Sequence, residues 1–292
     1  MKKTSNHNLR QIAFIVLLTA MAAGSSIGTG FADQKMKAEE LVAKHLESIA
    51  PAETLASVKT RIVTGTVVVT FREPATGQLG GRMVMASAGN KNMLGMIFDN
   101  STNYPAEKIG FDGDEVSGSY VRPGARSTLA DFMLTHRTIV KQGLVGGALS
   151  QSWPLLDLTS KKPKLEMSGT RKIGERQAYQ LKYFPSGGSD LQVSLFFDVE
   201  TFQHLRTEYN RTIVAAIGST PDTSARQRES RYKMVEDFSD FRKEGPLMLP
   251  HKYRIQLELA GQGTFKAEWD MTLEQVRFNN RLDPKSFDVD DK

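Results

Sequence analysis

The sequence predicts an α+β protein in which about eleven antiparallel strands form one curved sheet and two helical segments cover its concave apolar face. Three observations support this fold class. Apolar and polar residues alternate with a period of two through most of the chain, as in strands with one buried face. The links between these stretches have hairpin length, so neighbouring strands run antiparallel. A sheet with so many strands tends to curl.

Residues 1–32 stand apart from the rest of the chain. Three cationic residues lie in or before an apolar run at 12–23, and small residues at Gly30 and Ala32 suit cleavage. This is the pattern of a secretory signal peptide cleaved near Ala32. The alternative is an uncleaved anchor, but glycine and serine at 24–26 interrupt the apolar run early for a membrane span.

The sequence contains no cysteine, so it forms no disulfide and carries no lipid on an N-terminal cysteine. An exported protein of this kind fits a bacterial periplasm, and its core alone must stabilise it. Removal of residues 1–32 takes three of the 38 basic residues and none of the 33 acidic ones, which leaves a charge of +2. So mild an excess, on an exported protein, predicts no nucleic-acid partner.

The first element after the signal is an amphipathic helix at residues 36–49, which Pro51 ends. Its apolar stripe comprises Leu41, Val42, His45, Leu46 and Ile49.

Strands follow at residues 61–72, 81–89 and 91–99, and a hairpin follows at 106–121. The hairpin is predicted to turn on an Asp-Gly pair, which suits a two-residue turn. In the strand 91–99 the buried face is open to two interpretations, because apolar residues occupy both faces. One face carries Leu94, Met96 and Phe98, and the other carries Met93 and Ile97.

The period then changes, and residues 127–158 are predicted to be helical. Ser127 is the expected N-cap, since its hydroxyl can accept from a backbone N–H of the first turn. Glycines at 143–147 break the second half, and Pro154 ends it.

Strands resume at residues 164–185 and continue to the end of the chain. In the hairpin 191–209 the apolar face of the first strand is followed, after a turn at Glu200 and Thr201, by a return strand carrying Leu205, Thr207 and Tyr209. A polar loop at 218–226 precedes the last strands, which lie at 231–242, 249–260 and 264–278. No linker divides the chain, so residues 33–292 are predicted to form a single domain.

No catalytic or metal-binding set is visible, so we predict neither an enzyme nor a cofactor. The four histidines after the signal lie outside the spacings of zinc motifs; they are His45, His136, His204 and His251. The stretch 111–115 (FDGDE) has two interpretations, a cation-binding loop or a hairpin turn. The turn is the simpler one, because the ligand series of a calcium loop is incomplete.

Methionine is common on the predicted apolar faces and admits two interpretations. Its flexible, polarisable side chain suits a cavity that adapts to acyl chains, and it equally fills irregular cores. The residues concerned are Met83, Met85, Met93, Met96, Met133, Met234, Met248 and Met271.

Four segments resemble the LolA family of periplasmic carriers and the wider group of outer-membrane lipoprotein-sorting proteins. VSLFFDVETFQHLRTE (193–208) resembles the family's strand–D-x-x-T–strand hairpin. FSDFRKEGPLMLPHKYRI (238–255) is similar to its aromatic–Asp–aromatic and Leu-Pro element. VRFNNRLDPKSFDV (276–289) and KIGFDGDEV (108–116) resemble its closing segment and its Asp-Gly hairpin.

The resemblance implies an open half-barrel with helices across its mouth. It also implies a role: such proteins shield acyl chains of lipoproteins or other lipids between an inner-membrane donor and an outer-membrane acceptor. The chain departs from the family in its length and in the helical insertion at about 127–158, and no closing arginine of the LolA type can be placed. An alternative of another class is an envelope sensor or interaction protein of the same fold, with a filled, dry core and no transported cargo.

On the carrier interpretation, one set of residues is predicted to line the cavity and another to form a moving lid. The cavity set is Val67, Val69, Phe71, Leu94, Met96, Phe98, Leu195, Phe197, Ile255, Leu257, Trp269 and Met271. The lid set is Phe132 and Trp153.

Overall fold

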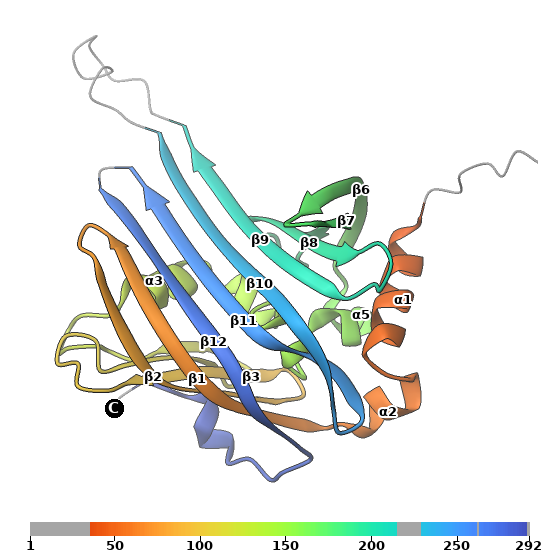
Figure 1. Cartoon of the computed structure of the whole chain (residues 1–292), viewed down its shortest axis with the longest axis horizontal. Coiled ribbons are helices and arrows are strands. Elements are labelled where there is room, and N and C mark those ends of the chain that lie inside the picture. Colours follow the sequence, from red (N-terminus) through yellow and green to blue (C-terminus); the bar gives the residue numbers. More distant parts are fainter. Residues whose placement is uncertain (1–35, 215–228, 262, 291–292) are drawn as a thin grey trace, which may run out of the picture. The chain divides into compact units, whose positions relative to one another are not determined.

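Twelve strands form one antiparallel sheet in the computed structural model of the chain (Figure 1). The structure describes residues 36–214, 229–261 and 263–290, which belong to one unit, Met36–Lys292. The predicted signal peptide (1–32) and the polar loop (218–226) lie outside the described residues. The strands are β1 Thr60–Glu73, β2 Gly77–Ala88, β3 Lys91–Phe98, β4 Ala106–Phe111, β5 Val116–Gly118, β6 Lys164–Ile173, β7 Arg176–Phe184, β8 Gln192–Asp198, β9 His204–Ile213, β10 Ser230–Glu244, β11 Leu247–Ala260 and β12 Thr264–Phe278.

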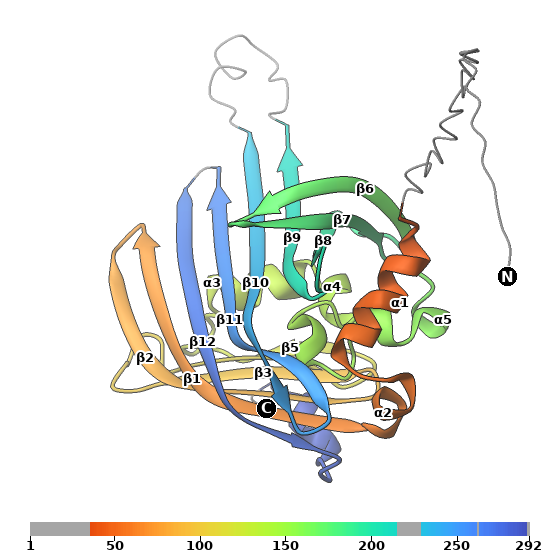
Figure 2. The ribbon, with the colours of Figure 1, turned by 45° about the vertical axis from the view of Figure 1, so that its right-hand side comes forward.

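The strand order explains how the chain covers its own sheet. The order is β5-β4-β3-β2-β1-β12-β11-β10-β9-β8-β7-β6, so every pair is sequential except β1 with β12. The two edge strands, β5 and β6, are consecutive in the chain. The segment that joins them, residues 119–163, is called the strap below. It leaves one edge of the sheet and returns at the other, along the inner side of the bend (Figure 2).

Short helices make up the strap and the N-terminal cover. They are α1 Ala38–Ile49, α2 Ala52–Ser57, α3 Thr128–Thr135, α4 Thr138–Lys141, η1 Gly147–Leu149, η2 Pro154–Leu156 and α5 Leu158–Lys161, and a last turn, η3 Pro284–Phe287, follows β12. Along the strap, α3 packs on β4 and β5, η1 packs on β9 and β11, and η2 packs on α1. The predicted class, an open curved antiparallel sheet with helices on its concave face, is confirmed.

The strap is less helical than the sequence predicts. Only Thr128–Thr135 forms a helix of two turns, with the Ser127 hydroxyl accepting from the backbone N–H of Ala130 at 2.9 Å. The glycines that follow serve close packing: Gly143 has φ +78°, and a Cβ there would lie 2.0 Å from the carbonyl oxygen of Ser152. The positive φ at Gly143 ends the short helix α4, as the glycine break predicted at 143–147 requires.

Two hairpin details also differ from the prediction. The 106–121 hairpin closes through a four-residue loop, in which Asp112 Oδ1 accepts from the backbone N–H groups of Asp114 and Glu115, each at 2.9 Å. In the 191–209 hairpin a bulge shifts the register after Phe196. Leu205 therefore packs with Phe196 and Ala178 in a separate small cluster.

The main core lies between the inner face of the sheet and the strap. Residues alternate between buried and partly exposed along β1, as the period of two requires. The registers then bring apolar residues of adjacent strands together: Val67 lies opposite Met271, and Trp269 lies between Val69 and Ile255. One apolar layer thus runs across the sheet beneath the strap.

Candidate ligand-binding site

The residues predicted to line a cavity lie on the inner face of the sheet. Eleven of the twelve are at most 4% exposed, and Phe71 is half-buried near the end of β1. In β3 the buried face is that of Leu94, Met96 and Phe98, whereas Ile97 is 59% exposed. Leu195 and Phe197 lie on β8. In the strand order, β8 is separated from β3 by six other strands. The structure therefore joins these residues in one layer rather than in one compact pocket.

The two residues predicted to form a lid lie in the strap and are buried. Phe132 is in α3, and its ring lies 4.7 Å from that of His136. Trp153 precedes η2, and its indole stacks on the imidazole of His204 with 4.9 Å between ring centres. Its Nε1 donates to His45 Nε2 at 3.3 Å.

Glu236 of β10 holds the centre of the strap. Its carboxylate accepts from the backbone N–H of Gly146 at 2.7 Å, from the Tyr209 hydroxyl at 2.6 Å and from the Tyr253 hydroxyl. Burial raises the pKa of Glu236 to about 7, although these three donors act in the opposite direction. A carboxyl group without a cationic partner in this network thus fixes the strap to the sheet.

Arg61 of β1 binds the strap at Ala148, two residues after the Gly146 contact of Glu236. Its guanidinium donates to the carbonyl oxygen of Ala148, and its Nε has no hydrogen-bond partner among the described residues. Burial lowers the pKa of Arg61 to about 10. Ser87 Oγ of β2 accepts from the backbone N–H of Gln151 at 2.8 Å. The strap is therefore tied to several strands by polar groups that water does not reach.

Two buried histidines complete these attachments. His45 Nδ1 lies 3.0 Å from the carbonyl oxygen of Phe202, and its Nε2 accepts from Trp153. Burial lowers the pKa of His45 to about 4. Burial and the proximity of His45 hold the pKa of His204 well below its usual value. Both imidazoles are therefore neutral in the folded protein at neutral pH.

Little space remains between the strap and the sheet. A hollow of about 20 Å³ lies there, lined by Met85, Leu94, Ile109 and Met133 among others. A volume of this size holds about one water molecule. The inner face is thus largely filled by the chain itself.

A larger hollow opens at one end of the inner face and is called the mouth pocket below. It measures about 330 Å³, within the range of small-molecule sites. Four stretches of chain that are distant in sequence supply its walls. Its lining residues are Phe71, Leu79, Ser101, Asn103, Tyr104, Val121, Arg122, Arg126, Ser127, Thr128, Leu129, Phe265 and Trp269.

The floor of the mouth pocket is aromatic and continuous with the core. Tyr104 stacks on Phe98 at 4.8 Å between ring centres and meets the Phe71 ring edge-on at 5.4 Å. Trp269 Nε1 donates to the Tyr104 hydroxyl at 3.1 Å. Phe71 and Trp269 are members of the predicted cavity set, and they connect this pocket to the apolar layer under the strap.

Glu107 lies behind Tyr104 of this aromatic floor and is fully buried. Its Oε2 accepts from the Tyr104 hydroxyl at 2.5 Å, whereas Oε1 has no hydrogen-bond partner among the described residues. Burial raises the pKa of Glu107 to about 7, against the opposite effect of the Ser127 and Tyr104 hydroxyls. At neutral pH this carboxyl group is therefore protonated in a large fraction of molecules.

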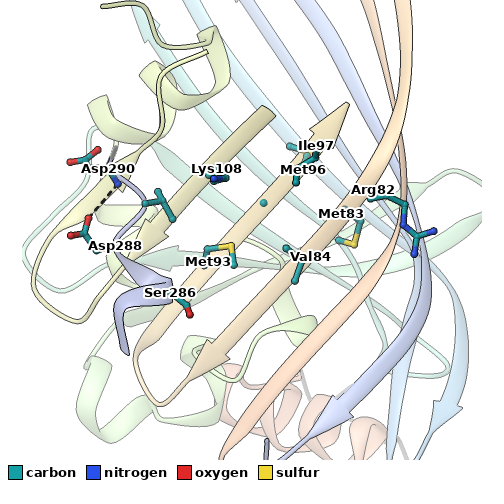
Figure 3. A pocket seen from close by; sticks show the side chains of 12 residues that line it. Arg82, Met83, Val84, Met93, Met96, Ile97, Lys108, Ser286, Asp288 and Asp290 are labelled. Atoms are coloured by element: carbon teal, nitrogen blue, oxygen red, sulfur yellow. Dashed lines mark hydrogen bonds between the residues drawn. The ribbon is translucent and has the colours of Figure 1, made fainter. Parts of the chain in front are cut away.

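Another hollow, of about 390 Å³, lies on the outer face of β2, β3 and β4 beside the C-terminal segment (Figure 3). Val84, Met93 and Ile97 give it an apolar side, and Lys108, Asp288 and Asp290 border it. It shares only Met96 with the predicted cavity set and opens away from the apolar layer. We therefore take the mouth pocket as the candidate site.

Sequence reasoning missed the polar half of the mouth pocket. Behind the pocket, Glu107 falls in phase with Ile109 and Phe111, and the period of two is a signal that could have placed it on the buried face. Tyr104, Arg122 and Arg126 lie in loops, where no period indicates which way a side chain points.

The described part of the chain shows neither a cluster of three residues suited to a metal ion nor a helix long and apolar enough to span a membrane.

Comparison with known proteins finds similarity among solved structures. No family model and no curated protein matches the chain. It is similar to a LolA superfamily protein of Nitrosomonas europaea, with 14% identity over 86% of this chain and 96% of that one and a TM-score of 0.46. It is also similar to a domain of Vibrio parahaemolyticus described as an outer membrane lipoprotein-sorting protein (10% identity, 86% and 95% covered, TM-score 0.43). A DUF1329 family protein of Desulfovibrio piger is similar as well (10% identity, 86% and 97% covered, TM-score 0.45).

At these identities and TM-scores, what this chain binds has to be inferred from its own residues.

Proposed function

We propose that the protein is a periplasmic carrier that shields acyl chains of lipoproteins or other lipids during transfer toward the outer membrane. The observation that carries the proposal is the mouth pocket, whose aromatic floor continues into the apolar layer of the predicted cavity set. An acyl chain that enters beside Trp269 would lie against the apolar layer of the inner face. Binding, rather than catalysis, is the activity that such a surface supports.

The strap sets how deep a chain can enter. Each buried methylene contributes roughly 0.8 kcal/mol, so a long acyl chain can offset the loss of several strap hydrogen bonds worth about 1 kcal/mol each. We propose that the strap, with Phe132 and Trp153, acts as a lid that moves outward as the chain enters. Release then requires a competing acceptor, for which an outer-membrane protein is the expected partner, with an inner-membrane protein as the donor.

The first test is organic extraction of residues 33–292, purified without detergent from a periplasm, followed by mass spectrometry. The proposal expects phospholipid or acylated peptide in near-stoichiometric amount. Val121→Trp should reduce this amount severalfold, because Val121 is a half-buried lining residue and a larger side chain fills the pocket. Val68→Trp is the matched control, since Val68 is 36% exposed on the outer face of β1.

A second function is favoured by a specific observation, the hollow of about 20 Å³ between strap and sheet. A filled core suits an envelope sensor or interaction protein that carries no cargo. On this alternative the extract contains no stoichiometric lipid, and Val121→Trp and Val68→Trp behave alike. That result would contradict the carrier proposal.

A further inference from the structure

We propose that the cargo is an anionic amphiphile whose head group is held by Arg122 and Arg126 at the rim of the mouth pocket. This inference rests on the proposed function and adds the chemical class of the ligand. The pocket lining is positively charged: its thirteen residues include two arginines and no carboxylate.

Arg122 is the member of the pair whose side chain has no partner among the described residues. Its side chain is exposed, and it makes no hydrogen bond or ion pair among the residues that the structure describes. A guanidinium carries five N–H donors in a planar arrangement that matches carboxylate and phosphate oxygens. Arg122 is therefore free to turn toward an anion at the rim.

Arg126 is the fixed member. Its Nε donates to the carbonyl oxygen of Gly118 at 2.8 Å, and its guanidinium lies 4.0 Å from the centre of the Tyr120 ring. One nitrogen also lies 3.4 Å from Asp290, an ion pair that is partly exposed and therefore weak. These contacts hold one edge of the guanidinium and orient it within the pocket lining.

The rest of the pocket requires an apolar tail beside this charge. Leu79, Leu129, Phe265 and Trp269 line it together with the two arginines. A free inorganic anion would leave this surface exposed, and an uncharged chain would leave Arg122 without a partner. An amphiphile with a carboxylate or a phosphate head satisfies both parts of the site.

Apart from Asp290, which already pairs with Arg126, Glu107 is the acidic group to consider behind the pocket, and it opposes an anionic head group only weakly. It lies behind Tyr104 and Ser127 and is absent from the pocket lining. Because burial raises the pKa of Glu107 to about 7, much of it is neutral at that pH. The rim arginines therefore dominate the charge that a ligand head meets.

Isothermal titration calorimetry on residues 33–292, below the micelle concentration, tests the inference. The ligands are decanoate, decyl phosphate, the uncharged decanol and inorganic phosphate. We expect both anionic amphiphiles to bind roughly tenfold more tightly than decanol, a difference of about 1.4 kcal/mol. Which of the two anions binds more tightly identifies the head group.

Arg122→Gln should remove most of that preference while leaving decanol binding and the melting temperature unchanged, because Arg122 is exposed and has no partner to lose. Arg82→Gln is the matched control: Arg82 is an exposed arginine that pairs with Glu274 at 3.0 Å beside the outer hollow. Arg126→Gln should lower the preference as well, with a lower melting temperature from the lost contact to Gly118.

Three results would overturn the inference. If decanol binds as tightly as the anions, the head-group assignment fails and the carrier function survives. If inorganic phosphate binds as tightly as decyl phosphate, the site recognises a free anion. If none of the chain compounds binds, the proposed function fails together with this inference.

Discussion

Single buried carboxyl groups determine how this protein responds to pH. Glu236 and Glu107 are both fully buried, and both have a pKa of about 7 in the folded protein against 4.5 ordinarily. A folded state with the higher pKa binds more protons than the unfolded chain between these two values. Stability from these groups is thus fully present below pH 4.5 and is lost as pH rises through about 7.

The variant Glu236→Gln should flatten this dependence. We expect the free energy of unfolding of the parent to fall between about pH 4.5 and 7, and each of the two carboxyl groups to contribute on the order of 3 kcal/mol to the fall. Urea unfolding at several pH values measures it. Glu258→Gln, at an exposed position of β11, is the control and should leave the slope unchanged. An unaltered slope in Glu236→Gln would show that this carboxyl group does not titrate in the range.

The buried histidines act at lower pH and with the opposite sign. The pKa of His45 is lowered from 6.5 to about 4 in the folded protein, so stability from its neutral form is lost as pH falls from about 6.5 through 4. His45→Gln keeps a group that can donate to Phe202 and accept from Trp153. We expect its unfolding free energy to fall less steeply between pH 6 and 4 than that of the parent. Equal slopes would contradict the assignment.

At the scale of elements, the strap depends on glycines that allow it to touch itself. A Cβ at Gly143 would lie 2.0 Å from the Ser152 carbonyl oxygen, whereas a Cβ at Gly124 meets nothing within 4 Å. Both residues have positive φ, +78° and +73°. Gly124→Ala should therefore cost about 1 kcal/mol from backbone strain alone, and Gly143→Ala several times more. Denaturant midpoints measure the stability that each variant loses. Equal losses in the two variants would mean that the backbone at Ser152 shifts to make room for the added Cβ.

Whether the strap moves can be tested by a cross-link. A Cβ built at Gly118 of β5 lies 3.7 Å from Cβ of Ala130 of α3, a spacing that suits a disulfide. Because the chain has no cysteine of its own, Gly118→Cys with Ala130→Cys gives one defined bond between strap and sheet. On the lid hypothesis, lipid uptake is reduced when the bond is formed and returns after reduction.

The reduced double variant is the internal control for that experiment, since it contains the same substitutions without the bond. Uptake that is equal in the oxidised and reduced forms would contradict an outward movement of α3. It would leave the mouth pocket as the whole of the binding site.

At the scale of the whole molecule, the depth of the site should appear in the dependence of affinity on chain length. Each added methylene that becomes buried increases affinity roughly fourfold, which corresponds to about 0.8 kcal/mol. We expect affinity to keep rising with chain length in the parent and to level off early when Gly118 and Ala130 are cross-linked. Titration with a series of fatty acids measures both curves. An early plateau in the parent as well would confine the ligand to the mouth pocket.

The strands and their inner face could be predicted from the residues alone. Alternation with a period of two is a local property, so Val67, Val69, Ile255 and Trp269 could be assigned to one apolar layer before any pairing was known. Hairpin-length links then determined the antiparallel neighbours. The same reasoning was less successful within the strap: the pattern predicts helix over 127–158, whereas only Thr128–Thr135 forms a helix of two turns and the rest is short turns packed on α1 and the sheet.

What packs against the inner face depends on how the whole chain folds. Only the strand order shows that β5 and β6 are the two edges, and therefore that residues 119–163 run along the inner side of the sheet. The mouth pocket, the anchoring of Glu236 to Gly146 and the two rim arginines follow from that path. The physical reason is that burial of a polar group and the shape of a pocket depend on segments distant in the chain, whereas the period of a strand depends on its own residues alone.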